Sequence, residues 1–162
     1  MTGEGESAGF THLDERGRAR MVNVGGKDAS VRRAVARARV HMAPETARAI
    51  AEQAVAKGDV LAVARIAGIQ AAKRTSEAIP LCHPLMLSSV EVDCSVGEAA
   101  VDIEARVEVV DRTGVEMEAL HACAVAALTV YDMCKALDQD MVIGELALWE
   151  KSGGRSGLYQ RG

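Results

Sequence analysis

Residues 90–109 read VEVDCSVGEAAVDIEARVEV, and apolar and polar side chains alternate along both halves of this stretch. Such alternation has the two-residue period of a strand that buries one face and leaves the other in water. Gly97 interrupts the pattern at the point where a turn would join the two halves. The stretch therefore predicts an antiparallel hairpin with one solvated face.

The segments on either side of the hairpin predict further strands and helices. We expect strands over residues 18–24, 31–42 and 141–149. We expect a helix over residues 44–57, which begins at Pro44 and is ended by Gly58. We expect two more over 59–73, capped by Asp59, and over 113–137, opened by a capping box from Thr113 to Glu116. In this order, the elements predict an α+β sandwich with helices on one face of an antiparallel sheet.

Chain length and composition indicate one domain with a core of small side chains. The 162 residues match the usual size of a single domain. We expect residues 1–10, which are Gly-rich and acidic, to form a flexible tail, and residues 11–162 to form the domain. Hydrophobic residues make up 49% of the chain but aromatic residues only 2%, so Ala, Val, Ile, Leu and Met must form closely spaced layers.

Charge and cysteine usage limit the class of partner. The net charge is −4, and the Lys and Arg residues are scattered among acidic ones, which disfavours a nucleic-acid partner. We see no signal peptide and no uncharged apolar run long enough to span a bilayer, so no membrane partner is expected. The four cysteines lack CxxC spacing and disulfide-like density, which favours the reducing cytoplasm.

Charged residues interrupt the apolar helix predicted over residues 113–137. Asp132 and Lys135 are three residues apart and so share one helix face, either as an ordinary ion pair or as part of a ligand site. Glu116 and Glu118 fall in the first turn, where the helix dipole stabilises anions. Capping accounts for Glu116, whereas Glu118 could also accept hydrogen bonds from a guanine-like edge.

Basic residues provide candidate ligands for a polyphosphate. Lys57 and Lys73 lie near predicted helix ends, where they could equally do no more than balance the helix dipole. The run from Lys151 to Gly154 combines a cation with backbone N–H groups that side chains do not shield. Together these features favour an enzyme that acts on a small phosphorylated metabolite without a redox cofactor.

Cys82 and His83 form the only adjacent Cys and His pair. A zinc site needs further ligands that no spacing in the sequence supplies, and nothing indicates an activated thiolate. His83 instead lies on a rigid, irregular segment between Pro80 and Pro84, which suits an imidazole that contacts a ligand. His121, inside the apolar helix, is expected to be a satisfied core residue.

Six segments then carry a resemblance to a known family. They are residues 57–59 (KGD), 64–75 (ARIAGIQAAKRT), 79–85 (IPLCHPL), 113–120 (TGVEMEAL), 131–135 (YDMCK) and 151–154 (KSGG). The chain closely resembles the MoaC family, the cyclic pyranopterin monophosphate synthases of molybdenum-cofactor biosynthesis. The resemblance spans nearly the whole chain after Thr11, although Asn23 stands where the family commonly has an aspartate.

This resemblance implies a fold, an assembly and a reaction. The implied fold is a ferredoxin-like α+β subunit, and the implied assembly is a hexamer built as a trimer of dimers with sites at the dimer interfaces. The implied reaction, by acid–base catalysis, converts 3′,8-cyclo-7,8-dihydroguanosine 5′-triphosphate into cyclic pyranopterin monophosphate and releases pyrophosphate. No tightly bound cofactor and no protein-held metal are implied, and whether a magnesium ion accompanies the triphosphate stays open.

The resemblance also implies which residues act. The implied catalytic residues are Asp132, Lys135 and Lys57. The implied substrate-binding residues are Leu81, Cys82, His83, Glu116, Met117, Glu118, Lys73, Arg32 and Lys151. Glu118 and Asp132 lie near opposite ends of one helix, roughly 20 Å apart at ~1.5 Å per residue, so we expect two protomers to share each site.

Two other classes of protein stay open from the sequence. A small α+β domain can also be a noncatalytic sensor of a small ligand, and fold alone does not decide between sensor and enzyme. A purely structural oligomer subunit would use the same charges as interface ion pairs. Formation of product from the cyclic nucleotide separates these alternatives.

Overall fold

A computed structural model describes residues 12–162, so the tail predicted at residues 1–10 lies outside the described residues. The elements, in chain order, are β1 (Ser30–His41), α1 (Pro44–Ala51), α2 (Val60–Lys73), α3 (Thr75–Ala78), β2 (Ser89–Val96), β3 (Ala100–Asp111), α4 (Glu116–Cys134), β4 (Val142–Ser152) and β5 (Tyr159–Gln160).

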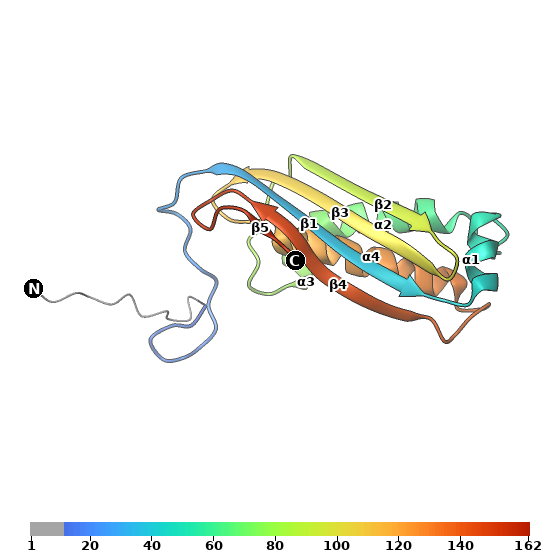
Figure 1. The fold of residues 1–162 in the computed structure, drawn as a ribbon. Helices are drawn as coiled ribbons and strands as arrows, with labels where there is room; N and C mark the ends of the chain where they lie inside the picture. Colours follow the sequence, from blue (N-terminus) through green and yellow to red (C-terminus); the bar gives the residue numbers. More distant parts are fainter. Residues whose placement is uncertain (1–11) are drawn as a thin grey trace, which may run out of the picture.

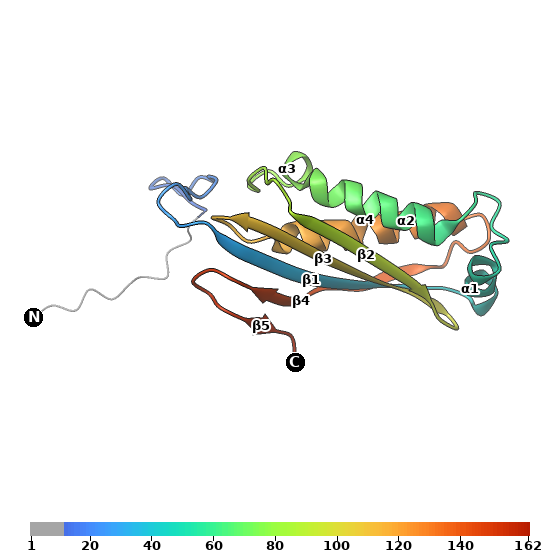
Figure 2. The same cartoon turned by 90° about the horizontal axis from the view of Figure 1, so that it is seen from above.

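The strands form one sheet in the order β2-β3-β1-β4-β5, and every neighbouring pair is antiparallel. Helices α2 and α4 cover one face of this sheet, and the described residues place no helix on the other face (Figures 1 and 2). The strand–helix–strand–strand–helix–strand connection and the order β4-β1-β3-β2 are those of a ferredoxin-like fold. The predicted fold class and the predicted hairpin are confirmed.

Small side chains form the core between α4 and the sheet. Ala34, Ala36 and Ala38 are almost fully buried and alternate along β1 with residues that are exposed or half-buried. The facing side of α4 is also rich in alanine, and the thiol of Cys123 donates a hydrogen bond to the carbonyl oxygen of Ala36 at 3.3 Å. The helix backbone therefore lies close to the strands, which increases dispersion contacts across the layer.

The apolar character of α4 corrects one expectation. This helix is long and apolar enough to cross a membrane by length and composition alone, contrary to the expectation that no apolar run is both long enough and free enough of charge. In the structure it packs against β1, β3, β4 and α2, so its hydrophobicity is explained by its place in the core.

Helix α1 begins at Pro44 as predicted but ends at Ala51 rather than at residue 57. Gln53 adopts a left-handed conformation with φ of 54°. The N–H of Ala54 bonds to the carbonyl of Ala49 at 2.8 Å, and that of Gln53 bonds to Ile50 at 3.1 Å. These two bonds form a Schellman motif, which ends the helix although glycine does not occupy its usual position. The predicted end at Gly58 is wrong because the left-handed Gln53 already ends the helix.

The N-terminal segment differs from its predicted strand at residues 18–24. Its only bridge within the described chain joins Leu13 and Ala19. The carbonyl of Val22 bonds to His83, and the side-chain oxygen of Asn23 accepts the N–H of Gly25 at 2.9 Å. These backbone groups find partners in a side chain and a local turn, so the segment needs no neighbouring strand.

The ends of α4 and β4 also differ from prediction. Helix α4 begins at Glu116, with Val115 at the N-cap position and no side-chain cap, so the capping box predicted at Thr113 is wrong. The carboxylate of Glu116 accepts a hydrogen bond from Lys151 at 2.9 Å instead. Helix α4 ends at Cys134 rather than near residue 137, whereas β4 continues to Ser152 and pairs with the short, unpredicted β5.

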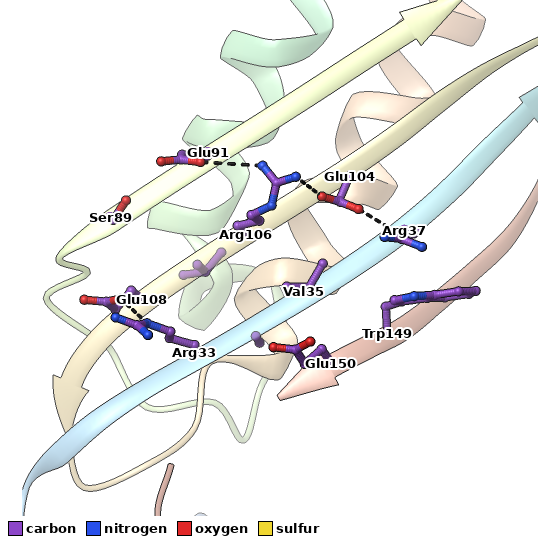
Figure 3. A pocket seen from close by; sticks show the side chains of 12 residues that line it. Arg33, Val35, Arg37, Ser89, Glu91, Glu104, Arg106, Glu108, Trp149 and Glu150 are labelled. Carbon is purple, nitrogen blue, oxygen red and sulfur yellow. Dashed lines mark hydrogen bonds and ion pairs between the residues drawn. The ribbon is translucent and has the colours of Figure 1, made fainter. Parts of the chain in front are cut away.

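The open face of the sheet carries a series of cross-strand ion pairs between β1 and β3. Arg37 bonds to Glu104 at 2.6 Å, Arg39 bonds to Asp102 at 2.6 Å, and Arg33 pairs with Glu108 in the same way. A hollow of about 470 Å³ lies over this face (Figure 3). Because acidic partners already contact its arginines, the hollow offers little uncompensated charge for a phosphate.

We predict that Gly68→Ala destabilises the fold. A Cβ at Gly68 in α2 would lie 3.0 Å from the carbonyl oxygen of Ala122 and 3.2 Å from both methyl groups of Val92. This overpacking should exceed the ~1 kcal/mol gain in helix propensity and lower the free energy of unfolding by about 1–2 kcal/mol. Gly26→Ala is the matched control, because a Cβ there meets no atom within 4 Å. Urea denaturation showing equal or higher stability for Gly68→Ala would contradict the predicted clash.

Candidate active site

The C-terminal end of α4 brings together the three predicted catalytic residues. Lys135 contacts one carboxylate oxygen of Asp132 at 2.9 Å. Lys57, from the loop after α1, contacts the other oxygen at 3.0 Å and the main-chain carbonyl of Asp132 at 2.8 Å. All three side chains are about half exposed. The predicted contact between Asp132 and Lys135 is confirmed, and Lys57 joins them within the same chain.

These contacts fix the charges in the cluster. Hydrogen bonds from Lys135 and then from Lys57 lower the pKa of the Asp132 carboxyl below its ordinary value. The hydrogen bond to Asp132 in turn raises the pKa of Lys135. Near neutral pH, Asp132 is therefore an ionised acceptor and Lys135 a protonated donor. In this state, Lys135 can supply a proton or bind an anion but cannot act as a base.

A separate cavity of about 380 Å³ lies at the other end of α4. Six predicted substrate-binding residues line it: Leu81, Cys82, His83, Glu116, Met117 and Glu118. Its opposite wall comes from the N-terminal segment, which contributes Val22, Val24 and Lys27. The Nε2 atom of His83 lies 2.8 Å from the carbonyl oxygen of Val22. Because a carbonyl only accepts, Nε2 must carry a proton, and this bond fixes the ring in the cavity wall.

Glu118 is the buried acid of this cavity, with only 4% of its surface exposed. Burial, and then the nearby charge of Glu116, raise the pKa of Glu118 to about 7. Burial, and then the charge of Glu118, raise the pKa of the Cys82 thiol. Glu118 can therefore gain or lose a proton near neutral pH, whereas Cys82 stays a thiol.

A smaller basic cavity adjoins the first one and shares Lys27 and Glu116 with it. Arg32 and Lys151 line this basic cavity, as does Gly153. The Nε atom of Arg32 is buried and has no hydrogen-bond partner within residues 12–162. A Cβ at Gly153 or Gly154 would collide with Val31 or Arg32, and both glycines have positive φ. The glycines thus let the loop close over the arginine, next to a space suited to an anion.

Other predicted residues lie apart from the two cavities. Lys73 is the exposed last residue of α2 and lines neither cavity. His121, predicted as a satisfied core residue, is half-buried, and its Nδ1 lies 3.2 Å from the hydroxyl of Thr75. Within residues 12–162, no group of three His, Cys, Asp or Glu side chains could hold a metal ion.

One chain does not unite the two groups of site residues. Glu118 and Asp132 are separated by roughly 21 Å at ~1.5 Å per helical residue. The cavity-lining residues Val22, Val24, Lys27 and Leu85 were not among the predicted site residues. The bond between the Val22 carbonyl and His83, distant in sequence, brings Val22, Val24 and Lys27 to the cavity. In the sequence itself, only the alternating valines and the basic side chain after two glycines pointed to this segment.

The fold and these sites define a small α+β protein with acid–base groups and a basic cavity at opposite ends of one helix. The chain belongs to the MoaC family, whose family model matches residues 21–154. It is 63% identical over 156 residues to the cyclic pyranopterin monophosphate synthase of Thermomicrobium roseum, covering 95% of this chain and 94% of that protein. It is 58% identical over 156 residues to the cyclic pyranopterin monophosphate synthase of Pelotomaculum thermopropionicum, covering 95% of this chain and 92% of that protein. It is 62% identical over 152 residues to the synthase of Roseiflexus sp., covering 93% of this chain and 96% of that protein.

We predict that Glu118 makes stability fall as pH rises between about 4.5 and 7. Its pKa rises from 4.5 to about 7 on folding, so in this window the folded state binds more protons than the unfolded state. The stabilisation from holding this proton is complete below pH 4.5 and lost above pH 7. Glu118→Gln should therefore be more stable than the wild type at pH 8, by about 1–3 kcal/mol, and similar at pH 4.5. Equal stability of the two proteins at pH 8 would contradict the raised pKa.

Proposed function

We propose that this chain is a cyclic pyranopterin monophosphate synthase. It converts 3′,8-cyclo-7,8-dihydroguanosine 5′-triphosphate into cyclic pyranopterin monophosphate and releases pyrophosphate, as a step of molybdenum-cofactor biosynthesis. The single observation that carries this proposal is the hydrogen-bonded Lys57–Asp132–Lys135 cluster, with contacts of 2.9 and 3.0 Å. The similar proteins match nearly the full chain, and their names support the same reaction.

The proposed reaction needs proton transfers and stabilised anions rather than electron transfer. Opening a purine imidazole ring and rebuilding it as a pyrazine require an acid and a base at fixed positions. Lys135 donates a proton, Asp132 accepts one, and Lys57 stabilises developing negative charge next to them. Glu118 and His83 hold the guanine-derived ring by its polar edges.

Arg32, Lys151 and the glycine loop bind the phosphates, which suits the basic cavity that they line. We propose no tightly bound cofactor, and magnesium enters only with the triphosphate. The assay should therefore be run with and without added magnesium after treatment with a chelator. The cytoplasm is the proposed location, because no step requires a partner outside it.

We propose further that two protomers share each active site within a hexamer of three dimers. The Glu118 end of one α4 then lies beside the Asp132 end of its partner, which removes the ~21 Å separation within one chain. The outer face of the helix layer supports this arrangement, since Ile66 is 61% exposed and Leu128 57% exposed in a single chain. Pairing of two copies would cover these side chains.

We predict that Asp132→Asn, Lys135→Ala and Lys57→Ala each abolish product formation. Each change removes a group that we place at the reacting bonds, while the three side chains are exposed enough that the fold should persist. Lys135→Arg should not restore activity, because a guanidinium does not release its proton at neutral pH. Product is measured by chromatography and folding by circular dichroism. Near-normal turnover in any alanine or asparagine variant would overturn the proposed roles, and ligand binding without turnover by the wild type would favour a sensor.

Mixing two inactive variants tests the shared site. We predict that Lys135→Ala and Glu118→Ala proteins, dissociated and reassembled together, recover part of the wild-type activity. Some mixed dimers then contain one site in which both residues are intact. Native mass spectrometry confirms that mixed dimers have formed. Inactive mixed dimers would show that each site is built within one chain.

A further inference from the structure

The first turn of α1 is capped by a residue from a distant part of the chain. Ala43 occupies the N-cap position and has no side-chain oxygen to bond the free N–H groups of that turn. Asp138, from the loop after α4, accepts the N–H of Ala43 at 2.8 Å and the hydroxyl of Thr46 at 3.4 Å. A residue 95 positions away in sequence therefore holds the start of α1 by the N–H of its N-cap residue and by a side-chain hydroxyl of its first turn.

The loop that carries Asp138 is itself fixed to the end of α4. The N–H of Asp138 bonds to the carbonyl of Cys134 at 3.2 Å, and the hydroxyl of Tyr131 donates to the carbonyl of Gln139 at 3.1 Å. The N–H of Asp140 bonds to the carboxylate of Asp138 at 3.0 Å, which orients that carboxylate. Asp138 is thus held three residues beyond Lys135.

The segment that contains α1 is also attached to the C-terminal end of α4 at its other end, through Lys57. Lys57 bonds to the carboxylate and the main-chain carbonyl of Asp132. The segment from Ala43 to Lys57 is therefore attached to the end of α4 at its beginning, by Asp138, and at its end, by Lys57. Helix α1 has only eight residues, too few to be stable alone, so its position depends on the core packing of Ala47 and Ile50 and on these two attachments.

We propose that Asp138 is a positioning residue, which holds α1 so that Lys57 reaches Asp132. The expected effect of Asp138 on turnover rests on the proposed function, whereas its effect on the position of Lys57 does not. Loss of the Asp138 contact lets the start of α1 move away from α4, and the movement carries the loop with Lys57 away from Asp132. Asp138 itself contacts no reacting atom.

The kinetic test compares Asp138→Ala with Asp140→Ala. We expect Asp138→Ala to lower kcat by about 10-fold to 100-fold, the size of loss that a small misplacement of a catalytic group produces, with KM within about 3-fold of wild type. Asp140→Ala removes a carboxylate from the same loop whose side chain has no hydrogen bond or ion pair within residues 12–162. It should keep wild-type kcat. An equal loss in both variants, or none in Asp138→Ala, would overturn the proposal.

A second variant separates positioning from helix stability. Ala43 has the extended conformation of an N-cap residue, so Ala43→Ser can cap α1 locally. In the Asp138→Ala background, Ala43→Ser should restore the unfolding temperature but leave kcat low, because the attachment to the α4 loop is still missing. Recovery of kcat together with stability would show that Asp138 is only a cap. Asp138→Asn keeps an acceptor oxygen and should retain kcat within about 3-fold of wild type.

A titration of Asp132 tests the inference without any activity measurement. Carboxyl-carbon NMR of the whole protein should show a higher pKa for Asp132 in Asp138→Ala, because the lowering hydrogen bond from Lys57 is lost. Removing the charge of Asp138 alone would shift this pKa the other way. If Asp138→Ala does not fold, the variant with Ala43→Ser takes its place. An unchanged or lower pKa of Asp132 in Asp138→Ala would overturn the proposal. If this pKa is raised but the wild-type protein forms no product, the proposed function alone is refuted.

Discussion

Close packing of α4 on the sheet determines where the residues of the candidate site can lie. The helix and β1 meet through alanine and cysteine side chains, and the bond from Cys123 to the Ala36 carbonyl shows how near the two backbones are. Such a layer has no room for a ligand or a solvated charge between helix and sheet. Function is therefore confined to the two ends of the helix and to the loops that meet there.

The two ends give their carboxyl groups opposite properties. Asp132 lies in water between two lysines, whose hydrogen bonds lower its pKa. Glu118 lies in a cavity wall with almost no exposed surface, and burial raises its pKa to about 7. One helix thus carries an acid that stays ionised and an acid that exchanges its proton near neutrality. In the proposed site, Asp132 accepts a proton and Glu118 holds the guanine-derived ring, provided that assembly brings both to one substrate.

Local sequence patterns predicted most of the fold and part of the site. Alternation identified the hairpin and β1, Asp59 marked the start of α2, and the spacing of Asp132 and Lys135 predicted their contact. The sequence could not show where α1 ends, because Gln53 adopts a conformation usual for glycine. The Val22 wall of the cavity and the Asp138 cap depend on contacts between distant segments, and such contacts leave no periodic signal.

The ion pairs on the open face have a consequence for folding. A shift of β1 by two residues along β3 keeps the apolar side chains facing the helices, so burial alone does not forbid it. In the native register, Arg33 and Arg37 face Glu108 and Glu104, but a shift by two in either direction sets one of these arginines opposite Arg106. Like charges directly opposite each other are destabilising. The charged face therefore rejects misaligned strand pairing during folding, a selection that a uniformly apolar or neutral face could not make.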